Sequence, residues 1–158
     1  PLINARQKQR VERFCAEAAA DGIPLLAEGE VSAEAPEGGH YVAPRLYGPV
    51  PRDHALAREE VFGPVLSLIP FEDEADAVAL ANGTDYGLVA GVWTTDAARA
   101  LRVARRIRAG QVFVNAYGAG GGIELPFGGM GKSGHGREKG FEGLREFTTL
   151  RTLVIKHG

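Results

Sequence analysis

Apolar residues recur every three to four positions near the start of the chain. Between residues 5 and 20 they follow the spacing i, i+3, i+4, i+7, i+8, and occupy Val11, Phe14, Cys15, Ala18 and Ala19. This spacing is typical of one buried face of a helix. Asp21-Gly22 come next, and a glycine here suits the left-handed backbone that ends many helices. The pattern therefore predicts a helix over 5–20 with Cys15 on its buried side.

Segments further along predict a loop, two strands and a second helix. The Glu-, Gly- and Pro-rich stretch 28–40 is expected to be an exposed loop. Residues 41–47 predict an edge or irregular strand, because Pro44 has no N–H to donate to a neighbouring strand. Residues 65–71 predict another strand, with Pro70 near its end. Residues 72–82 predict a helix with an acidic first turn, which Asn82-Gly83 ends.

The middle of the chain predicts a strand–helix–strand unit. Residues 88–94 and 112–114 are nearly all apolar, which indicates strands buried on both faces. Asp96 is expected to cap a helix over 97–108, whose inner face would hold Ala97, Ala100, Leu101, Ala104 and Ile107.

This order of elements favours an α/β fold. Strand, helix and strand in succession imply a parallel crossover, so we expect a three-layer, parallel-type sheet with flanking helices. A helix over 138–147 and a final strand over 150–156 would complete the chain, and the charged residues of that strand suit an edge.

Composition excludes several classes of function. Apolar residues make up 44% and charged residues 24% of 158 residues, as in ordinary globular proteins. The formal charge of -2 gives no reason to expect nucleic acid as a partner. No apolar run approaches the roughly 20 residues of a membrane helix, so no membrane partner is expected. The lone cysteine favours a reducing, cytoplasmic setting.

Three patterns would suggest nucleotide binding, a cysteine nucleophile or a metal site, but each lacks a feature that this chemistry requires. Residues 129–134 fit the dinucleotide fingerprint G-x-G-x-x-G and partly imitate a phosphate-binding loop, but no strand precedes them. Cys15 lies within a helix core rather than beside a cation or a helix start, which favours a small buried residue over a nucleophile. The four histidines lack the spacing of metal ligands.

Two signatures carry a family resemblance. They are Glu59-Glu60-Val61-Phe62-Gly63-Pro64-Val65 and Pro126-Phe127-Gly128-Gly129-Met130-Gly131-Lys132-Ser133-Gly134-His135-Gly136-Arg137-Glu138. Segments 82–88, 110–115 and 152–155 extend the similarity in the same order. The chain thus resembles the C-terminal part of NAD(P)-dependent aldehyde dehydrogenases over essentially its whole length.

The resemblance implies roles for particular residues. Glu60 would hold the hydroxyls of the nicotinamide ribose, since one carboxylate accepts hydrogen bonds from two neighbouring hydroxyls. Phe62 would pack near the nicotinamide ring. The family's substrate-lining positions fall on Asn115, Tyr117, Gly120 and Phe127.

Structural alternatives stay open for these residues. Glu60 would otherwise be a solvated acid and Phe62 a core residue, while Phe127 would anchor its loop in the core. Glu124 would attract a cationic substrate tail or be a plain loop acid.

The resemblance also indicates what the chain lacks. The family oxidises an aldehyde to a carboxylic acid through a cysteine nucleophile and a glutamate base, and no matching segment is present. We expect a piece of a longer dehydrogenase, with residues 1–148 from the catalytic domain and 149–158 as a terminal oligomerisation strand. Alone it would be inactive, and the coenzyme would be NAD or NADP. The alternative is a non-catalytic module that forms a homo-oligomer through strand 150–156.

Overall fold

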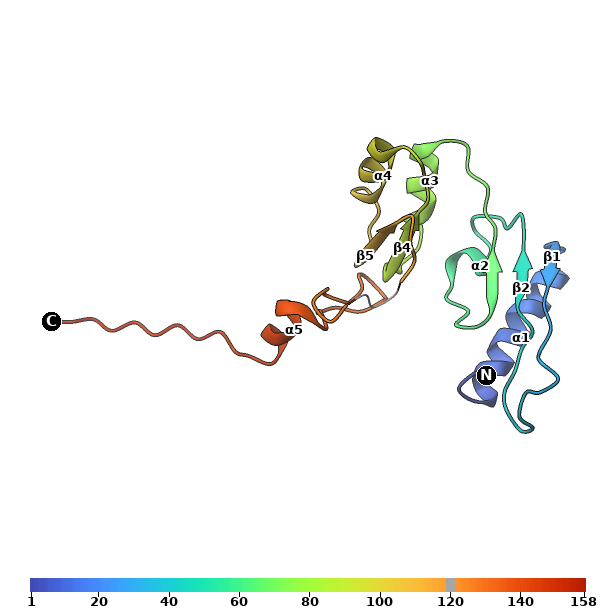
Figure 1. The fold of residues 1–158 in the computed structure, drawn as a ribbon, viewed down its shortest axis with the longest axis horizontal. Coiled ribbons are helices and arrows are strands. Elements are labelled where there is room, and N and C mark those ends of the chain that lie inside the picture. Colours follow the sequence, from blue (N-terminus) through green and yellow to red (C-terminus); the bar gives the residue numbers. More distant parts are fainter. Residues whose placement is uncertain (119–121) are drawn as a thin grey trace. The chain divides into compact units, whose positions relative to one another are not determined.

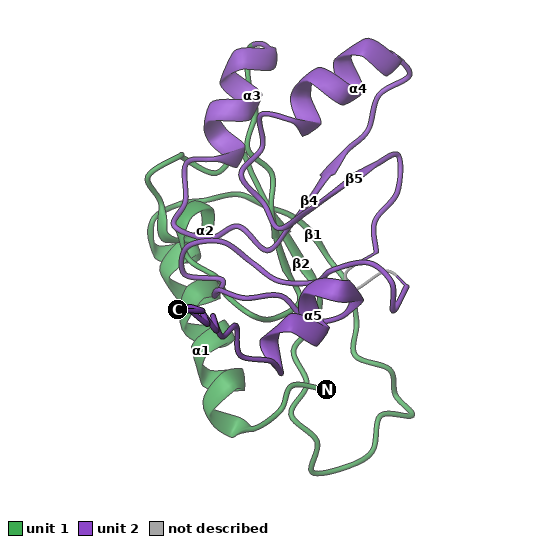
Figure 2. Cartoon of the chain, turned by 90° about the vertical axis from the view of Figure 1, so that its left-hand side faces the viewer, with its two compact units in different colours: residues 1–72 green, residues 73–158 purple. Residues whose placement is uncertain are grey.

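The computed structural model describes residues 1–118 and 122–158. Its elements follow the chain from α1 to α5 and from β1 to β5 (Figure 1). Contacts between Cα atoms divide the chain into unit 1, residues 1–72, and unit 2, residues 73–158 (Figure 2). No boundary at this point was predicted from the sequence.

Unit 1 contains a three-stranded mixed sheet. Its order is β1 (Leu25–Glu28), β2 (Arg45–Tyr47) and β3 (Val65–Ser67). β1 runs antiparallel to β2, and β2 runs parallel to β3. The sequence had predicted a parallel-type sheet, whereas this sheet contains one antiparallel and one parallel pair of strands. The strand β1 was not predicted. The two predicted strands over 41–47 and 65–71 exist only as these shorter segments.

Helix α1 (Ala5–Ala20) supplies much of the core of unit 1 and confirms the first predicted helix. The side-chain oxygen of Asn4 accepts a hydrogen bond from the N–H of Gln7 at 2.9 Å and caps the helix start. Gly22 takes the left-handed φ of 72° after the helix end. The short helix α2 (Ala55–Arg58) was not predicted. The buried core consists of Val11, Phe14, Cys15, Ala18, Tyr47, Val50, Leu56 and Val61.

Unit 2 contains the predicted strand–helix–strand arrangement. β4 (Val89–Val92) pairs in parallel with β5 (Gln111–Val114), and α4 (Ala97–Ala104) connects them in sequence. Helix α3 (Glu74–Ala81) precedes β4 and begins at the cap Asp73, whose carboxylate accepts from the N–H of Asp76 at 2.8 Å. The parallel pairing confirms the predicted crossover.

Burial in unit 2 corrects two predictions. The residues of β4 are all half-buried rather than buried on both faces, and those of β5 are half-buried or exposed, because only two strands pair here. The inner face of α4 holds Ala100 and Val103, whereas Leu101 is 59% exposed. Leu101 lies about 100° around the helix from Ala100, which turns its side chain away from that face.

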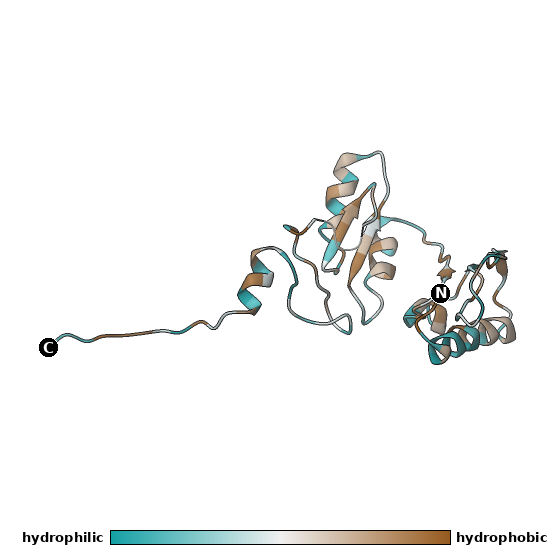
Figure 3. Cartoon of the chain, turned by 60° about the horizontal axis from the view of Figure 1, so that its bottom comes forward, coloured by the Kyte–Doolittle hydropathy of each residue, from teal (hydrophilic) through white to brown (hydrophobic). Residues whose placement is uncertain are grey.

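The C-terminal part also departs from the predictions. Helix α5 (Gly140–Glu146) begins after Glu138, so Glu142 and not Glu138 is the acid of its first turn. Residues 149–158 carry neither helix nor strand, so the predicted strand 150–156 is not formed in this structure. A strand requires a neighbour for its N–H and C=O groups. Figure 1 shows this segment as an extended trace after α5, and Figure 3 shows hydrophobic positions along it.

No helix in ranges 1–118 and 122–158 is both long and apolar enough to cross a membrane.

Candidate functional site

The segment that follows α2 presents one unengaged carboxylate. His54 caps α2 by accepting a hydrogen bond from the N–H of Leu56 at 3.1 Å, and the helix ends at Arg58. The carboxylate of Glu59 then lies 3.8 Å from the guanidinium of Arg10. Glu60 is exposed, and within the described residues no side chain pairs with its carboxylate. Of these two glutamates, Glu60 is the one whose carboxylate has no ion pair with a described residue.

Phe62 lies beside Glu60 with its ring in solvent. Its side chain is 70% exposed, so the alternative that Phe62 is a core residue does not hold. Its φ of 57° is in the left-handed region, which is unusual for a bulky side chain. The preceding residue, Val61, is buried in the core of unit 1. The backbone therefore anchors Val61 inward while it presents Glu60 and Phe62 outward.

Two side chains of α1 bind the backbone of this segment. The amide nitrogen of Gln7 donates to the carbonyl oxygens of Val61 and Phe62, each at 2.9 Å. The guanidinium of Arg10 donates to the carbonyl oxygen of Glu60 at 2.8 Å. Neither residue was predicted from the sequence, because both lie outside the apolar stripe of α1 and belong to neither family signature.

An open cavity of about 950 Å³ lies in unit 2. Phe127 lines it and is half-buried, and its backbone N–H and C=O pair reciprocally with Glu138 at 2.7 and 2.6 Å. The ammonium of Lys139 lies 5.8 Å from the centre of the Phe127 ring. Other apolar lining residues are Leu88, Ile123, Leu144 and Phe147. The cavity combines an apolar wall with charged groups at its edge.

The other candidate substrate residues have different surroundings. Asn115, with φ 51°, directly follows β5, and its side chain accepts from the N–H of Thr94 and donates to the C=O of Thr94, both at 2.9 Å. Tyr117 is exposed. Gly120 lies outside the described residues. Glu124 lines the cavity that contains Phe127.

The glycine-rich loop is held by its own contacts. Lys132 pairs with Asp85 at 2.8 Å, and the hydroxyl of Ser133 accepts from the N–H of Gly87 at 3.1 Å. Arg137 donates to the carbonyl oxygens of Gly129 and Gly136 at 3.0 and 2.6 Å. The next helix, α5, begins only at Gly140. A phosphate-binding loop needs its glycines directly before a helix, so this hypothesis gains no support.

Cys15 is a core residue, as the helix pattern predicted. It is 4% exposed and lies on the buried face of α1. Hydrogen bonds to Cys15 and Glu28 raise the pKa of Arg45, which also forms an ion pair with Glu28 at 2.7 Å. Burial, followed by the hydrogen bond to Cys15, raises the pKa of Tyr47. No face of the thiol is open to a substrate of ordinary size.

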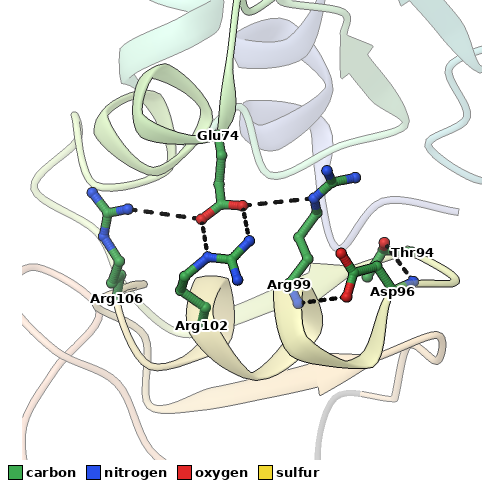
Figure 4. Close-up of polar contacts among 6 residues, drawn as sticks. All are labelled: Glu74, Thr94, Asp96, Arg99, Arg102 and Arg106. Carbon is green, nitrogen blue, oxygen red and sulfur yellow. Dashed lines mark hydrogen bonds and ion pairs between the residues drawn. The ribbon is translucent and has the colours of Figure 1, made fainter.

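A cluster of one carboxylate and three arginines joins α3 and α4 within unit 2 (Figure 4). Arg102 binds the carboxylate of Glu74 through two hydrogen bonds of 2.7 and 2.6 Å, and Arg99 and Arg106 approach it at 3.6 and 4.0 Å. The hydrogen bond from Arg102 is the main reason that the pKa of Glu74 is lowered. The ionised Glu74 carboxylate therefore stabilises the folded state at any pH above the ordinary pKa of a glutamate. This stabilisation is lost as the pH falls through the lowered pKa of Glu74. Glu74 and its three arginines connect α3 with α4 and the turn that follows it. Through Asp96, which accepts from the N–H of Arg99, the cluster continues to Thr94, the partner of Asn115.

In the part of the chain that the structure describes, no group of three or more His, Cys, Asp or Glu residues is arranged to hold a metal ion.

Comparison with known proteins assigns the family. Residues 1–153 match the model of the aldehyde dehydrogenase family, and the chain belongs to this family. The betaine aldehyde dehydrogenase of Rhizobium leguminosarum bv. trifolii is 37% identical over 158 residues, which are 100% of this chain and 32% of that relative.

Solved structures agree with this assignment. A crystal structure from Burkholderia cenocepacia, described as an aldehyde dehydrogenase, is 66% identical with a TM-score of 0.92. The match covers 100% of this chain and 33% of the Burkholderia cenocepacia chain. An aldehyde dehydrogenase of Mycobacterium tuberculosis complexed with NAD+ is 39% identical with a TM-score of 0.84. The match covers 94% of this chain and 30% of the Mycobacterium tuberculosis chain. These structures confirm the α/β fold class. The chain spans about a third of the length of the relatives it matches.

Proposed function

We propose that this chain forms part of an NAD(P)-dependent aldehyde dehydrogenase that oxidises an aldehyde to a carboxylic acid. Its contribution is to bind the coenzyme: Glu60 accepts hydrogen bonds from the nicotinamide ribose hydroxyls, and Phe62 packs near the nicotinamide ring. The observation that carries the proposal is the exposed Glu60 carboxylate, which has no protein partner in the described residues, beside the exposed ring of Phe62. A carboxylate without an ion pair keeps both oxygens available to a diol.

The second contribution concerns the aldehyde. The proposal assigns Asn115, Tyr117, Gly120 and Phe127 to the substrate pocket. Phe127 has the best support, because it borders an open and largely apolar cavity. The amide of Asn115 is already engaged by Thr94, so its part would be to shape the wall rather than to bind the aldehyde directly.

The chain on its own is proposed to be inactive. Aldehyde oxidation by this family needs a thiolate nucleophile that substrate can reach. The only cysteine, Cys15, is buried in the helix core. Glu60 can position a coenzyme but cannot replace covalent catalysis.

Removing the Glu60 charge tests the proposal directly. The experiment uses a chimera in which this chain replaces the matching third of the Burkholderia cenocepacia protein. Glu60→Gln is expected to raise the Kd for NAD+ or NADP+ by roughly tenfold or more, because hydrogen bonds to a charged group are lost or weakened. Coenzyme titration followed by fluorescence measures the change. Glu59→Gln is the matched control, since Glu59 faces Arg10, and it is expected to change the Kd by less than about twofold. Equal Kd values for the Glu60 variant and its parent would refute the coenzyme role.

A second function rests on the C-terminal segment. Its apolar side chains are exposed, and Leu150 is 99% exposed, so residues 149–158 offer an apolar segment that another copy of the chain could pair with as a strand. On this proposal the 158-residue protein is a non-catalytic module that forms a homo-oligomer through 150–156. Analytical ultracentrifugation is expected to show an oligomer that dissociates when residues 149–158 are deleted. A monomer in both samples would rule this function out.

A further inference from the structure

We propose that Asn82 is a site of spontaneous deamidation, and that the hydrogen bonds of its side chain in the folded protein set the rate. The chain has three asparagines, and only Asn82 is followed by glycine, whereas Asn4 and Asn115 are followed by alanine. A glycine has no Cβ, so its nitrogen approaches the preceding side chain more freely than that of a bulkier residue. Asparagine is also among the residues that are most easily lost to slow chemistry. The reaction needs no enzyme and takes water as its only co-reactant.

The reaction has two steps, which balance without an oxidant or a reductant. The backbone nitrogen of Gly83 loses its proton and forms a bond to the amide carbon Cγ of Asn82. The bond between Cγ and Nδ2 breaks, and ammonia leaves with the proton that Gly83 lost. Water then opens the resulting succinimide ring at either of its carbonyl groups. The product is aspartate or isoaspartate, and in isoaspartate the main chain runs through Cγ and is longer by one carbon atom.

In the folded protein, three hydrogen bonds hold Asn82 between the end of α3 and the turn that follows α4. The side-chain nitrogen Nδ2 donates to the C=O of Arg106 at 2.9 Å, and the side-chain oxygen Oδ1 accepts from the N–H of Arg108 at 2.7 Å. The guanidinium of Arg108 donates to the backbone C=O of Asn82 at 3.0 Å. These contacts of Asn82 with Arg106 and Arg108 are termed the Asn82 brace. The brace engages both the oxygen and the nitrogen of the amide that would be attacked.

The attacking nitrogen is engaged as well. The N–H of Gly83 donates to the C=O of Leu80 at 3.0 Å, within the turn that ends α3. Attack on Cγ requires this nitrogen to lose its proton and the Asn82 side chain to rotate toward it. The rotation breaks the contacts with Arg106 and Arg108. The reaction therefore proceeds from a locally opened turn, and such openings require less free energy than unfolding of the whole unit.

Water has access to this turn. Asn82 is half-buried, and it lines an open hollow of about 480 Å³ together with Thr84, Tyr86 and Arg108. No movement of a distant element is needed for water to reach the succinimide ring. Opening of the turn is therefore the step that limits the reaction in the folded protein.

Deamidation would weaken the brace. A carboxylate at position 82 still accepts from the N–H of Arg108, but it cannot donate to the C=O of Arg106 and places two acceptors against each other. Isoaspartate also lengthens the main chain where α3 ends. The turn before β5 would lose part of its attachment to α3, so the deamidated protein is expected to unfold at a lower urea concentration.

Deamidation rates of the folded and the denatured protein test the proposal. Both are incubated at neutral pH in heavy-oxygen water, which labels the new carboxylate, and their peptides are analysed by mass spectrometry. The chimera described above repeats the folded measurement within a complete dehydrogenase. In guanidinium chloride Asn82 should deamidate faster than Asn4 and Asn115, and a faster reaction at either would overturn the choice of site. In the folded samples Asn82 should react at least about tenfold more slowly than in the denatured chain. Equal rates would overturn the protective role of the brace.

Two arginine variants test the brace itself. Arg108→Ala removes the hydrogen bond to the backbone carbonyl of Asn82, and should speed deamidation of the folded protein roughly five- to tenfold, as the loss of one hydrogen bond from a charged donor predicts. Arg105→Ala is the matched control, because Arg105 is exposed in the same turn and its guanidinium pairs with no described residue. Equal deamidation rates in the two variants would show that the brace does not set the rate.

Amide hydrogen exchange of Gly83 gives a readout that needs no variant. It measures how often the turn opens in the folded protein, because exchange requires the bond to Leu80 to break. The slowing of exchange at Gly83 by folding should match the slowing of deamidation at Asn82 within a factor of about three. Deamidation that is faster than the opening of Gly83 allows would mean that the closed turn reacts, which contradicts the inference.

Discussion

Replacement of Gly110 by alanine is expected to destabilise unit 2 by about 3 kcal/mol, near the upper end of the usual cost of overpacking. A Cβ at this position would overlap the carbonyl oxygen of Gly128 and lie 2.7 Å from its carbonyl carbon. Both atoms belong to the backbone, so no side-chain rotation can relieve the overlap. The N–H of Gly110 also donates to the carbonyl of Gly87 at 3.1 Å, which fixes the position from the other side. The strand β5 and the glycine-rich loop would have to separate.

Fluorescence of Trp93 measures this change. It is the only tryptophan and directly follows β4, so its signal in urea reports the unfolding of unit 2. Gly118→Ala is the matched control, because a Cβ there would meet only a ring carbon of Phe113 at 4.0 Å. The control is expected to stay within about 0.5 kcal/mol of the parent. If both variants unfold at the same urea concentration, the close approach at Gly110 does not limit stability.

The helices were predicted well where side-chain periodicity coincides with a local end signal. α1 has an apolar stripe of the right spacing and a glycine after its end, and it spans the predicted residues. α4 was predicted too long, to residue 108, whereas the α-helix ends at Ala104. The apolar spacing continues to Ile107, but the backbone turns before it. Periodicity alone therefore identified the helix and not its end.

Strands were harder to delimit because they depend on distant partners. Arg45–Tyr47 pairs with residues 25–28 on one side and 65–67 on the other. Pro44 signalled an edge or irregular strand, but the residue at which the strand begins could not be predicted from residues 41–44. Residues 150–156 have the composition of a strand, yet they form none within this structure. A sequence records the preference of a segment, while the existence of a strand depends on a neighbour that local pattern does not specify.

The candidate site could be predicted only through its motif. Periodicity did not distinguish Glu60 from any other exposed acid, and the structure adds that it lacks the ion pair that Glu59 has. Gln7 and Arg10 could not be found in this way, because a side chain that donates to a backbone carbonyl 50 or more residues away leaves no local pattern. The same holds for Glu74, which binds an arginine 28 residues away.

The core of unit 1 gives the other large expected effect: Phe14→Ala should destabilise this unit by about 3 to 5 kcal/mol. Phe14 is 1% exposed and is one of the two largest fully buried side chains in the core. Its removal deletes a whole ring and leaves a cavity that the helix and the sheet can fill only in part. The guanidinium groups of Arg10 and Arg13, 4.9 and 5.0 Å from the ring centre, lose their aromatic contact as well.

Hydrogen exchange of the α1 amides at increasing urea concentration measures this loss in unit 1. Phe71→Ala is the control of equal chemistry, because Phe71 is 61% exposed, and it should change the free energy of unfolding by about 0.5 kcal/mol or less. Phe14→Leu should fall between the two, since leucine retains part of the apolar volume. If Phe14→Ala were no more damaging than Phe71→Ala, α1 would not be held by its buried face. The rigid support that Gln7 and Arg10 require for residues 60–62 would then be missing as well.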